Sequence, residues 1–146
     1  MGSGRIVLAW IGVEFPIRQI QAKRRQVWQC YYDNLHELIT RYNLRPPCVP
    51  HHCQQSYHMF YPVLHSLELR QALIAYLRER GILSVFHYLP LHLSTMGQQF
   101  GGKKGDCPVT KDICDRLIRL PFFNTLSESD QEFVIMNVKA GLETIL

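Results

Sequence analysis

Apolar side chains recur at helical spacing in three parts of the chain. From Ile17 to about Tyr42 they fall three, four or seven residues apart, which predicts an amphipathic helix. Ser66 begins a second periodic segment, which ends at Gly81, a residue typical of a helix terminus. Ser127 begins a third. The apolar faces consist of Ile20, Val27, Tyr31, Leu35, Leu38 and Ile39 in the first helix, Leu69, Leu73, Ile74 and Leu77 in the second, and Phe133, Val134, Val138 and Leu142 in the third.

The segments between these helices favour extended structure. Residues 56–64, 82–88 and 118–122 are rich in aromatic and β-forming residues and predict three strands. The stretch Thr110–Leu117 predicts a short helix capped by its first residue, and the glycine-rich stretch 90–108 predicts a long loop. The expected fold class is therefore α+β, with a short antiparallel-type sheet and helices on one of its faces.

Composition fits one compact domain. Of the 146 residues, 47% are apolar and 19% are charged, which is ordinary for a globular protein. The longest apolar run near the start, residues 6–13, is far shorter than the roughly 20 residues of a membrane-spanning helix, so no span is expected. The net charge of +4 is spread over short clusters, which does not indicate a nucleic-acid-binding face. Five cysteines without framework spacing favour reduced thiols in the cytoplasm.

The densest group of polar rings lies between Phe86 and His92. Side chains alternate along a strand, so His87 and Tyr88 would point to opposite faces, and at least one of them would face a cleft or a partner. Their hydrogen-bonding groups favour contact with a polar ligand. The alternative is that these rings only cover a half-exposed sheet. The other aromatic segment, residues 57–61, is by itself typical of a core strand.

A zinc site is an alternative suggested by a loose group of cysteines and histidines. The group contains no Cys-x-x-Cys pair, so we expect no metal site. The glycines near Lys103 lack the order of a phosphate-binding P-loop, and the serines lack a nucleophile elbow. The residues of the zinc alternative are Cys48, His51, His52 and Cys53, with Cys107 and Cys114 as distant partners.

Several short motifs occur in an order that resembles one enzyme family. They are Arg24-Arg25-Gln26-x-Trp28-x-x-Tyr31-Tyr32, Pro50, His58-Met59-Phe60-Tyr61, Gly81-Ile82, Phe86-His87-Tyr88-x-Pro90-Leu91-His92 and Arg119-Leu120-Pro121-Phe122-Phe123-Asn124. Together they resemble the carboxy-terminal third of the DegT/DnrJ/StrS sugar aminotransferases. Within that family the likeness is greatest to members that aminate dTDP-4-keto-6-deoxy-D-glucose for the enterobacterial common antigen.

The resemblance implies the small domain of a type I pyridoxal-phosphate (PLP) aminotransferase. It implies a homodimer, a dTDP-linked keto-deoxy sugar as substrate and an amino acid, usually glutamate, as amino donor. The family's cofactor lysine lies upstream and no lysine here matches it, so we expect no catalytic or cofactor-binding residue in this chain, which should be inactive alone. His87, Tyr88 and His92 match the family motif near the substrate, and His58 and Tyr61 are further substrate-binding candidates.

Residues 1–19 do not fit the resemblance. They are expected to be an atypical segment that arises from truncation, an altered reading frame or a fusion junction, while residues 20–146 form the aminotransferase small domain. Nothing upstream would cover the first helix, so self-association through that helix is expected. The alternative function is a free-standing, non-catalytic module that binds a sugar nucleotide or has a regulatory role.

Overall fold

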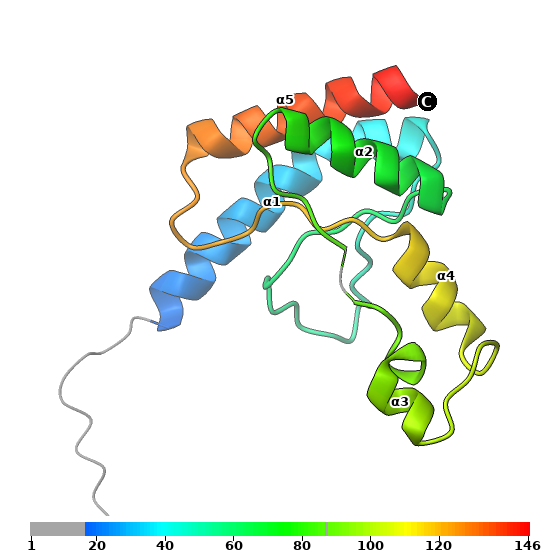
Figure 1. The fold of residues 1–146 in the computed structure, drawn as a ribbon. Coiled ribbons are helices and arrows are strands. Elements are labelled where there is room, and N and C mark those ends of the chain that lie inside the picture. The colour runs from blue at the N-terminus through cyan, green and yellow to red at the C-terminus, as the bar shows by residue number, and fades with distance from the viewer. Residues whose placement is uncertain (1–16, 87) are drawn as a thin grey trace, which may run out of the picture.

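The computed structural model describes residues 17–86 and 88–146, and all regular elements in this part of the chain are helices (Figure 1). The predicted first, second and last helices are confirmed. None of the helices in the described ranges combines the length and the apolar character that a membrane crossing needs. The elements are α1 (Ile17–Arg41), α2 (Leu67–Glu79), the 3₁₀ helix η1 (Leu91–Leu93), α3 (Thr95–Gln99), α4 (Pro108–Arg116) and α5 (Glu128–Ile145).

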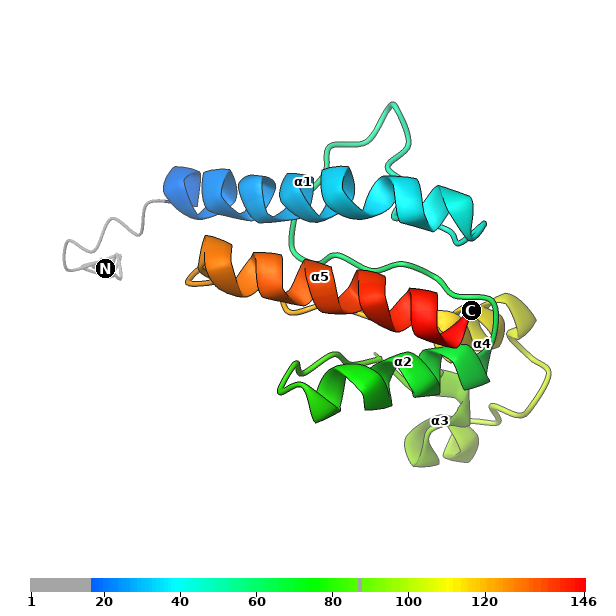
Figure 2. The ribbon, with the colours of Figure 1, turned by 90° about the horizontal axis from the view of Figure 1, so that it is seen from above.

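The three long helices form one layer, and α5 lies in its middle (Figure 2). This helix runs parallel to α1 and antiparallel to α2. Near its start, the buried Gln131 amide donates to Val27 O at 2.7 Å. Near its end, Gly141 lies against Leu73 and Tyr76 of α2. The last helix of the chain therefore connects the first two.

Hydroxyl side chains cap two of the long helices, as the sequence indicates. The Ser66 hydroxyl accepts a hydrogen bond from Leu69 N at 3.2 Å, and the Ser127 hydroxyl accepts one from Asp130 N at 3.0 Å. Each bond satisfies an amide that has no partner in the first helical turn, which contributes about 1 kcal/mol. Gly81, just beyond α2, has φ of 74°, a conformation that a side chain would disfavour.

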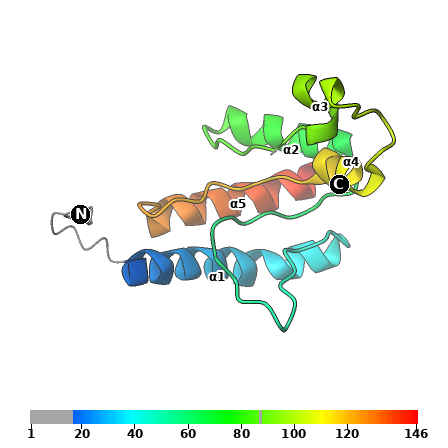
Figure 3. The same cartoon turned by 90° about the horizontal axis from the view of Figure 1, so that it is seen from below.

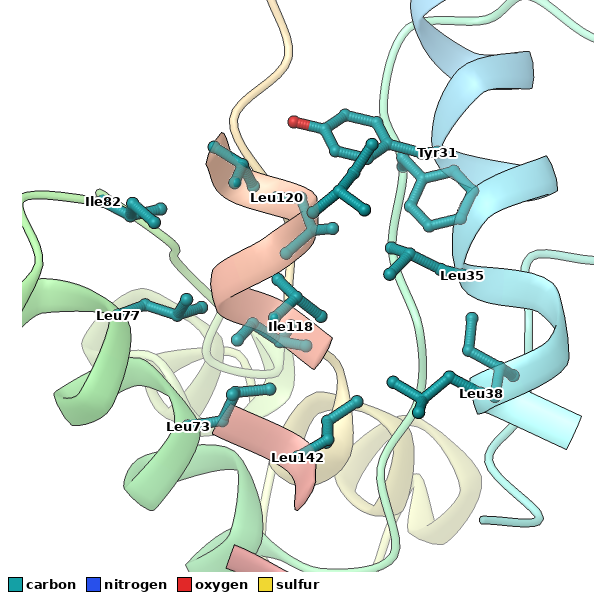
Figure 4. Packing of buried hydrophobic residues seen from close by; sticks show 14 of the residues in the cluster. Tyr31, Leu35, Leu38, Leu73, Leu77, Ile82, Ile118, Leu120 and Leu142 are labelled. Atoms are coloured by element: carbon teal, nitrogen blue, oxygen red, sulfur yellow. The ribbon is translucent and has the colours of Figure 1, made fainter. Parts of the chain in front are cut away.

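The core lies where the helical layer meets the extended segments (Figure 4). Leu35 of α1, Leu73 of α2 and Leu142 of α5 point toward this centre, and each is at most 1% exposed. Burial of side chains of this size contributes about 1.5–3 kcal/mol each. At the edge of the core, the Tyr31 hydroxyl donates to Pro121 O at 2.8 Å. Burial raises the pKa of Tyr31.

The predicted sheet is wrong for the described residues, which contain no strand. The three extended segments pair only through isolated antiparallel bridges. Pro62 is one cause: Ile118 N donates to Pro62 O at 3.2 Å, but proline has no N–H with which to return the bond. The architecture is therefore a helical layer over extended segments. The bridges join Arg45 to Val63, Val63 to Leu117 and Val85 to Arg119.

Two predictions for residues 90–117 also need correction. The expected loop contains η1 and α3. The following helix, α4, begins at Pro108 with Cys107 in the capping position, so Thr110 is not its cap. Proline is favoured at the first helical position because an N–H there would have no helical partner. Helix α3 has only five residues, too few for a periodic pattern.

Candidate substrate-contact sites

His58 and Tyr61 lie in an extended segment that passes an aromatic cluster on α1. Trp28 of that helix meets Tyr57 edge-on, with ring centroids 5.8 Å apart. Tyr57 has φ of 49°, a left-handed conformation that costs an aromatic residue about 1–2 kcal/mol. On either side of Tyr57, Ser56 Oγ and His58 Nδ1 lie 2.6 Å apart and share a hydrogen bond. The backbone conformation and this bond together orient the imidazole.

The structure brings His58 and Tyr61 together at one small cavity. It has a volume of about 190 Å³ and is also lined by residues of the connector 47–55. The imidazole and the phenol can each donate or accept a hydrogen bond. Pockets that enclose whole ligands usually measure about 300–1,000 Å³. The cavity therefore fits one polar group of a larger ligand.

The second candidate segment runs from Val85 into η1. It is anchored by the bridge from Val85 to Arg119. Tyr88 is 70% exposed, and His92 in η1 is half-buried. His87 lies outside the described residues. The exposed tyrosine and the half-buried histidine are placed where a large partner or ligand can reach them.

Two glycines hold η1 against α3. A Cβ atom at Gly97 would lie 2.0 Å from Leu91 O, and one at Gly102 would lie 2.4 Å from His92 O. Both distances are impossible for a side chain, so the backbones approach this closely only because glycine is present. The Ser94 hydroxyl also accepts from Gly97 N at 3.0 Å and caps α3. The position of the His92 backbone is therefore fixed by its neighbours.

The two candidate segments do not form one site within this chain. The connector lies toward the α1 edge of the helical layer and η1 and α3 lie toward its α2 edge (Figures 2 and 3), but both are on the face that carries the extended segments (Figure 1). Between them, the segment 60–64 and Val85 both pair with residues 116–120. The cavity at His58 and Tyr61 is lined by no described residue of 85–93, so the two segments do not share one pocket.

The lysines do not fit a PLP site. A lysine that forms a Schiff base usually has its pKa lowered by burial or by a neighbouring cation. Lys103 and Lys104 are exposed, and Lys111 forms an ion pair with Asp115. The other two, Lys23 and Lys139, are only half-buried. No described lysine has the desolvated setting that the cofactor requires.

The residues of the zinc alternative do not gather around a common point. Among the described residues, no group of three or more histidine, cysteine or carboxylate side chains is arranged to hold a metal ion. Cys48 and Cys53 are exposed, and all five cysteines are free thiols. The rings of His51 and His52 lie edge to face, with centroids 5.2 Å apart.

Three buried polar side chains were not predicted from the sequence pattern. Arg70 is 5% exposed, Ser84 is 3% exposed and Trp28 is 7% exposed, and each buries a polar atom that lacks a hydrogen-bond partner in the described part of the chain. The burial of Arg70 could have been predicted from its position, because it lies three residues before Leu73 and seven before Leu77, on the apolar face of the helix. No comparable signal marks Ser84.

Comparisons with known proteins agree with the fold. Residues 16–139 match the model of the DegT/DnrJ/EryC1/StrS aminotransferase family. An uncharacterized protein of Methanocaldococcus jannaschii is 30% identical over 143 residues, covering 91% of this chain and 35% of that protein. The aminotransferase TlmJ from Streptoalloteichus hindustanus has a TM-score of 0.75 and 29% identity, covering 89% of this chain and 34% of that one. A Streptococcus pneumoniae protein assigned as a sugar aminotransferase, in its PLP form, has a TM-score of 0.74 and 24% identity, over 86% of this chain and 32% of that one.

These matches cover a small part of the relatives but most of this chain. This chain spans about a third of the length of the relatives. The match to the family model, in contrast, covers most of the chain and includes every candidate ligand contact, from His58 to His92. The chain belongs to the DegT/DnrJ/EryC1/StrS aminotransferase family.

Proposed function

We propose that this chain forms the carboxy-terminal, substrate-side part of a PLP-dependent nucleotide-sugar aminotransferase. The whole enzyme would transfer an amino group, with glutamate as donor, to the keto carbon of a dTDP-linked 4-keto-6-deoxyhexose. The family match over residues 16–139 carries the proposal. The 29% identity with the TlmJ aminotransferase across 89% of the chain supports it. The product would enter lipopolysaccharide or enterobacterial common antigen synthesis in the cytoplasm.

In this proposal, the residues 20–146 form the small domain and contribute hydrogen bonds to the sugar nucleotide. His87, Tyr88 and His92 form one contact segment, and His58 and Tyr61 form the other. The exposure of Tyr88 and the fixed backbone of His92 support contact with a group that lies outside this chain. A homodimer would supply further surface around the two segments, which lie toward different edges of the same face of the helical layer.

The cofactor belongs to the part of the enzyme that the relatives have beyond this third. PLP, when bound, supplies an electron sink for amino transfer. The described lysines do not fit it, so the role of this chain is limited to binding and orienting the sugar. We therefore expect the isolated chain to be inactive.

The first test is turnover by the purified 146-residue chain with PLP, glutamate and the dTDP-linked keto sugar. No amino sugar should form, and the absorbance of PLP should not shift as it does when an imine forms with a lysine. Turnover would contradict the assignment of the chemistry to the missing part. Tight binding of the sugar nucleotide by a monomeric chain would favour the non-catalytic module.

The second test uses a chimera in which residues 20–146 replace the carboxy-terminal third of the TlmJ aminotransferase. Tyr88→Phe and His92→Leu should each raise KM for the sugar about five- to tenfold, because each removes about one hydrogen bond to the substrate. The reaction of bound cofactor with the amino donor alone should not change. His52→Leu, on the exposed connector, is the matched control. Equal effects of all three substitutions would refute the assigned contacts.

A further inference from the structure

A pocket on the outer face of α2 is separate from the connector cavity that holds His58 and Tyr61. It has a volume of about 440 Å³ and lies between this helix and the extended segment 83–86. Ile74, Leu83 and Phe86 give it apolar walls, and Arg70 and Arg78 add two positive charges. No carboxylate is among its lining residues in the described part of the chain. An anion would therefore meet attraction from both arginines without a competing acid in the wall.

The guanidinium of Arg70 has one edge without a partner. Nη1 donates to Cys114 O at 2.8 Å, while Nε is buried and has no hydrogen-bond partner in the described part of the chain. Nε and Nη2 share the edge of the guanidinium that binds carboxylate or phosphate through two parallel hydrogen bonds. Burial lowers the pKa of Arg70 and Asp115 opposes this, yet arginine stays charged. A bound anion would pair with that edge.

Ser84 supplies a second polar group without a partner in the same wall. Its hydroxyl is buried and makes no hydrogen bond in the described part of the chain. A buried hydroxyl without a partner costs about 1–3 kcal/mol, so two such groups in one pocket call for an explanation. Phe86 lies over the Arg70 guanidinium, with its ring centroid 4.2 Å from the central carbon, and is 41% exposed. Movement of this ring would uncover the Arg70 guanidinium.

We infer that this pocket binds a small organic anion, a phosphate monoester or a carboxylate attached to an apolar body. The anion bonds to the free edge of Arg70 and to the Ser84 hydroxyl. The apolar body lies against Ile74, Leu83 and Phe86. Arg78, exposed at the last turn of α2, attracts the ligand and contributes a second charge. The inference does not depend on the aminotransferase proposal, because it uses none of the substrate-contact residues.

The test is a titration of the ¹⁵N-labelled chain with four probes, in which NMR measures the chemical shifts of the backbone amides. Phenyl phosphate and benzoate carry both ligand features, phenol lacks the anion, and inorganic phosphate lacks the apolar body. Phenyl phosphate or benzoate should shift the amides of Ser84, Phe86 and Ile74 in a saturable manner. Phenol and inorganic phosphate should bind at least about tenfold more weakly, since each loses one set of contacts. The stronger of the two anions identifies the preferred head group.

Substitutions distinguish a loss of ligand binding from a loss of folding. Arg78→Gln is exposed and should leave stability unchanged while it weakens binding about three- to fivefold, as the loss of one exposed charge pair implies. Arg70→Lys keeps the charge but removes the two-bond edge, and should weaken binding about tenfold. Lys104→Gln, an exposed cation in another part of the chain, is the matched control.

Three results would overturn the inference. One is the absence of saturable shifts around Ser84. Another is equal weakening by Arg78→Gln and Lys104→Gln, which would mean attraction to the net charge alone. The third is an ordered water, seen by crystallography, that satisfies Arg70 Nε and Ser84 Oγ and is retained in the presence of phenyl phosphate.

Discussion

Replacement of Gly141 by alanine gives a sharp test of how closely α5 approaches α2. In an exposed helix interior, this change would stabilise the protein by about 1 kcal/mol through helix propensity. Here a Cβ atom would lie 2.8 Å from Tyr76 Cδ1 and 2.9 Å from Leu73 Cδ1. Comfortable carbon contacts are about 3.5–4.0 Å, so each contact is too short by at least about 0.6 Å. The two effects have opposite signs, and their sizes decide the outcome.

The contacting side chains differ in their freedom to move. Leu73 is fully buried, so its displacement disturbs the core. Tyr76 is only half-buried, but the Arg80 guanidinium lies 3.4 Å from its ring centroid and limits its movement. Overpacking of this kind costs about 1–3 kcal/mol. After subtraction of the propensity gain, we expect Gly141→Ala to destabilise the fold by about 1 kcal/mol.

Urea unfolding followed by tryptophan fluorescence measures the difference, because Trp28 lies in the core. A loss of about 1 kcal/mol corresponds to a fall in Tm of roughly 4 °C for a domain of this size. The matched background is Tyr76→Ala, which removes two of the three closest contacts. In that background, Gly141→Ala should be less harmful or stabilising. A gain of about 1 kcal/mol in the unmodified chain would refute the close approach.

Three other predictions concern the core and the candidate sites. Tyr31→Phe should cost about 1 kcal/mol at neutral pH, because it removes the bond to Pro121 O. Burial raises the pKa of Tyr31 in the folded state, so the free energy of unfolding of the unmodified chain should fall above about pH 10, by up to about 1.4 kcal/mol per pH unit. In Tyr31→Phe, the free energy of unfolding should fall less steeply with pH over the same range. Gly97→Ala should remove hydrogen-exchange protection in residues 91–102 but leave it unchanged in α1; protection in 91–102 equal to that of the unmodified chain would contradict the glycine contact. Gln131→Met should lower the free energy of unfolding by about 1 kcal/mol through loss of the bond to Val27 O, and a change below the error of a urea titration would show that this bond does not couple α5 to α1.

The long helices could be predicted because their signals are local and agree with one another. In α2, the Ser66 cap, the apolar stripe and Gly81 all indicate the same boundaries. The extended segments could not be predicted in the same way. Aromatic and β-branched residues favour extended backbone, but a ladder depends on the pairing of distant segments, and at Pro62 a donor is missing. Extended backbone was therefore predictable, whereas the absence of a sheet was not.

The candidate sites, like the fold, were only partly predictable from the sequence. Motif resemblance singled out Tyr88 and His92. The structure adds what the motif cannot contain: His58 lines a cavity with the connector, which lies toward the α1 edge of the helical layer, whereas η1 lies toward the α2 edge. The pocket at Arg70 was not predicted, because an arginine inside a helix is most often exposed. Arg70 is held in place by Phe86 and by the Cys114 carbonyl, which are distant from it in sequence.

The middle position of α5 has a consequence for truncated chains. In the described part of the chain, α1 and α2 do not approach each other closely, and both pack against the 18 residues of α5. A product that stops before residue 128 leaves the α5-facing sides of both helices exposed, although α1 still has Phe60 to pack against. Such a product should expose apolar surface that chaperones and proteases recognise.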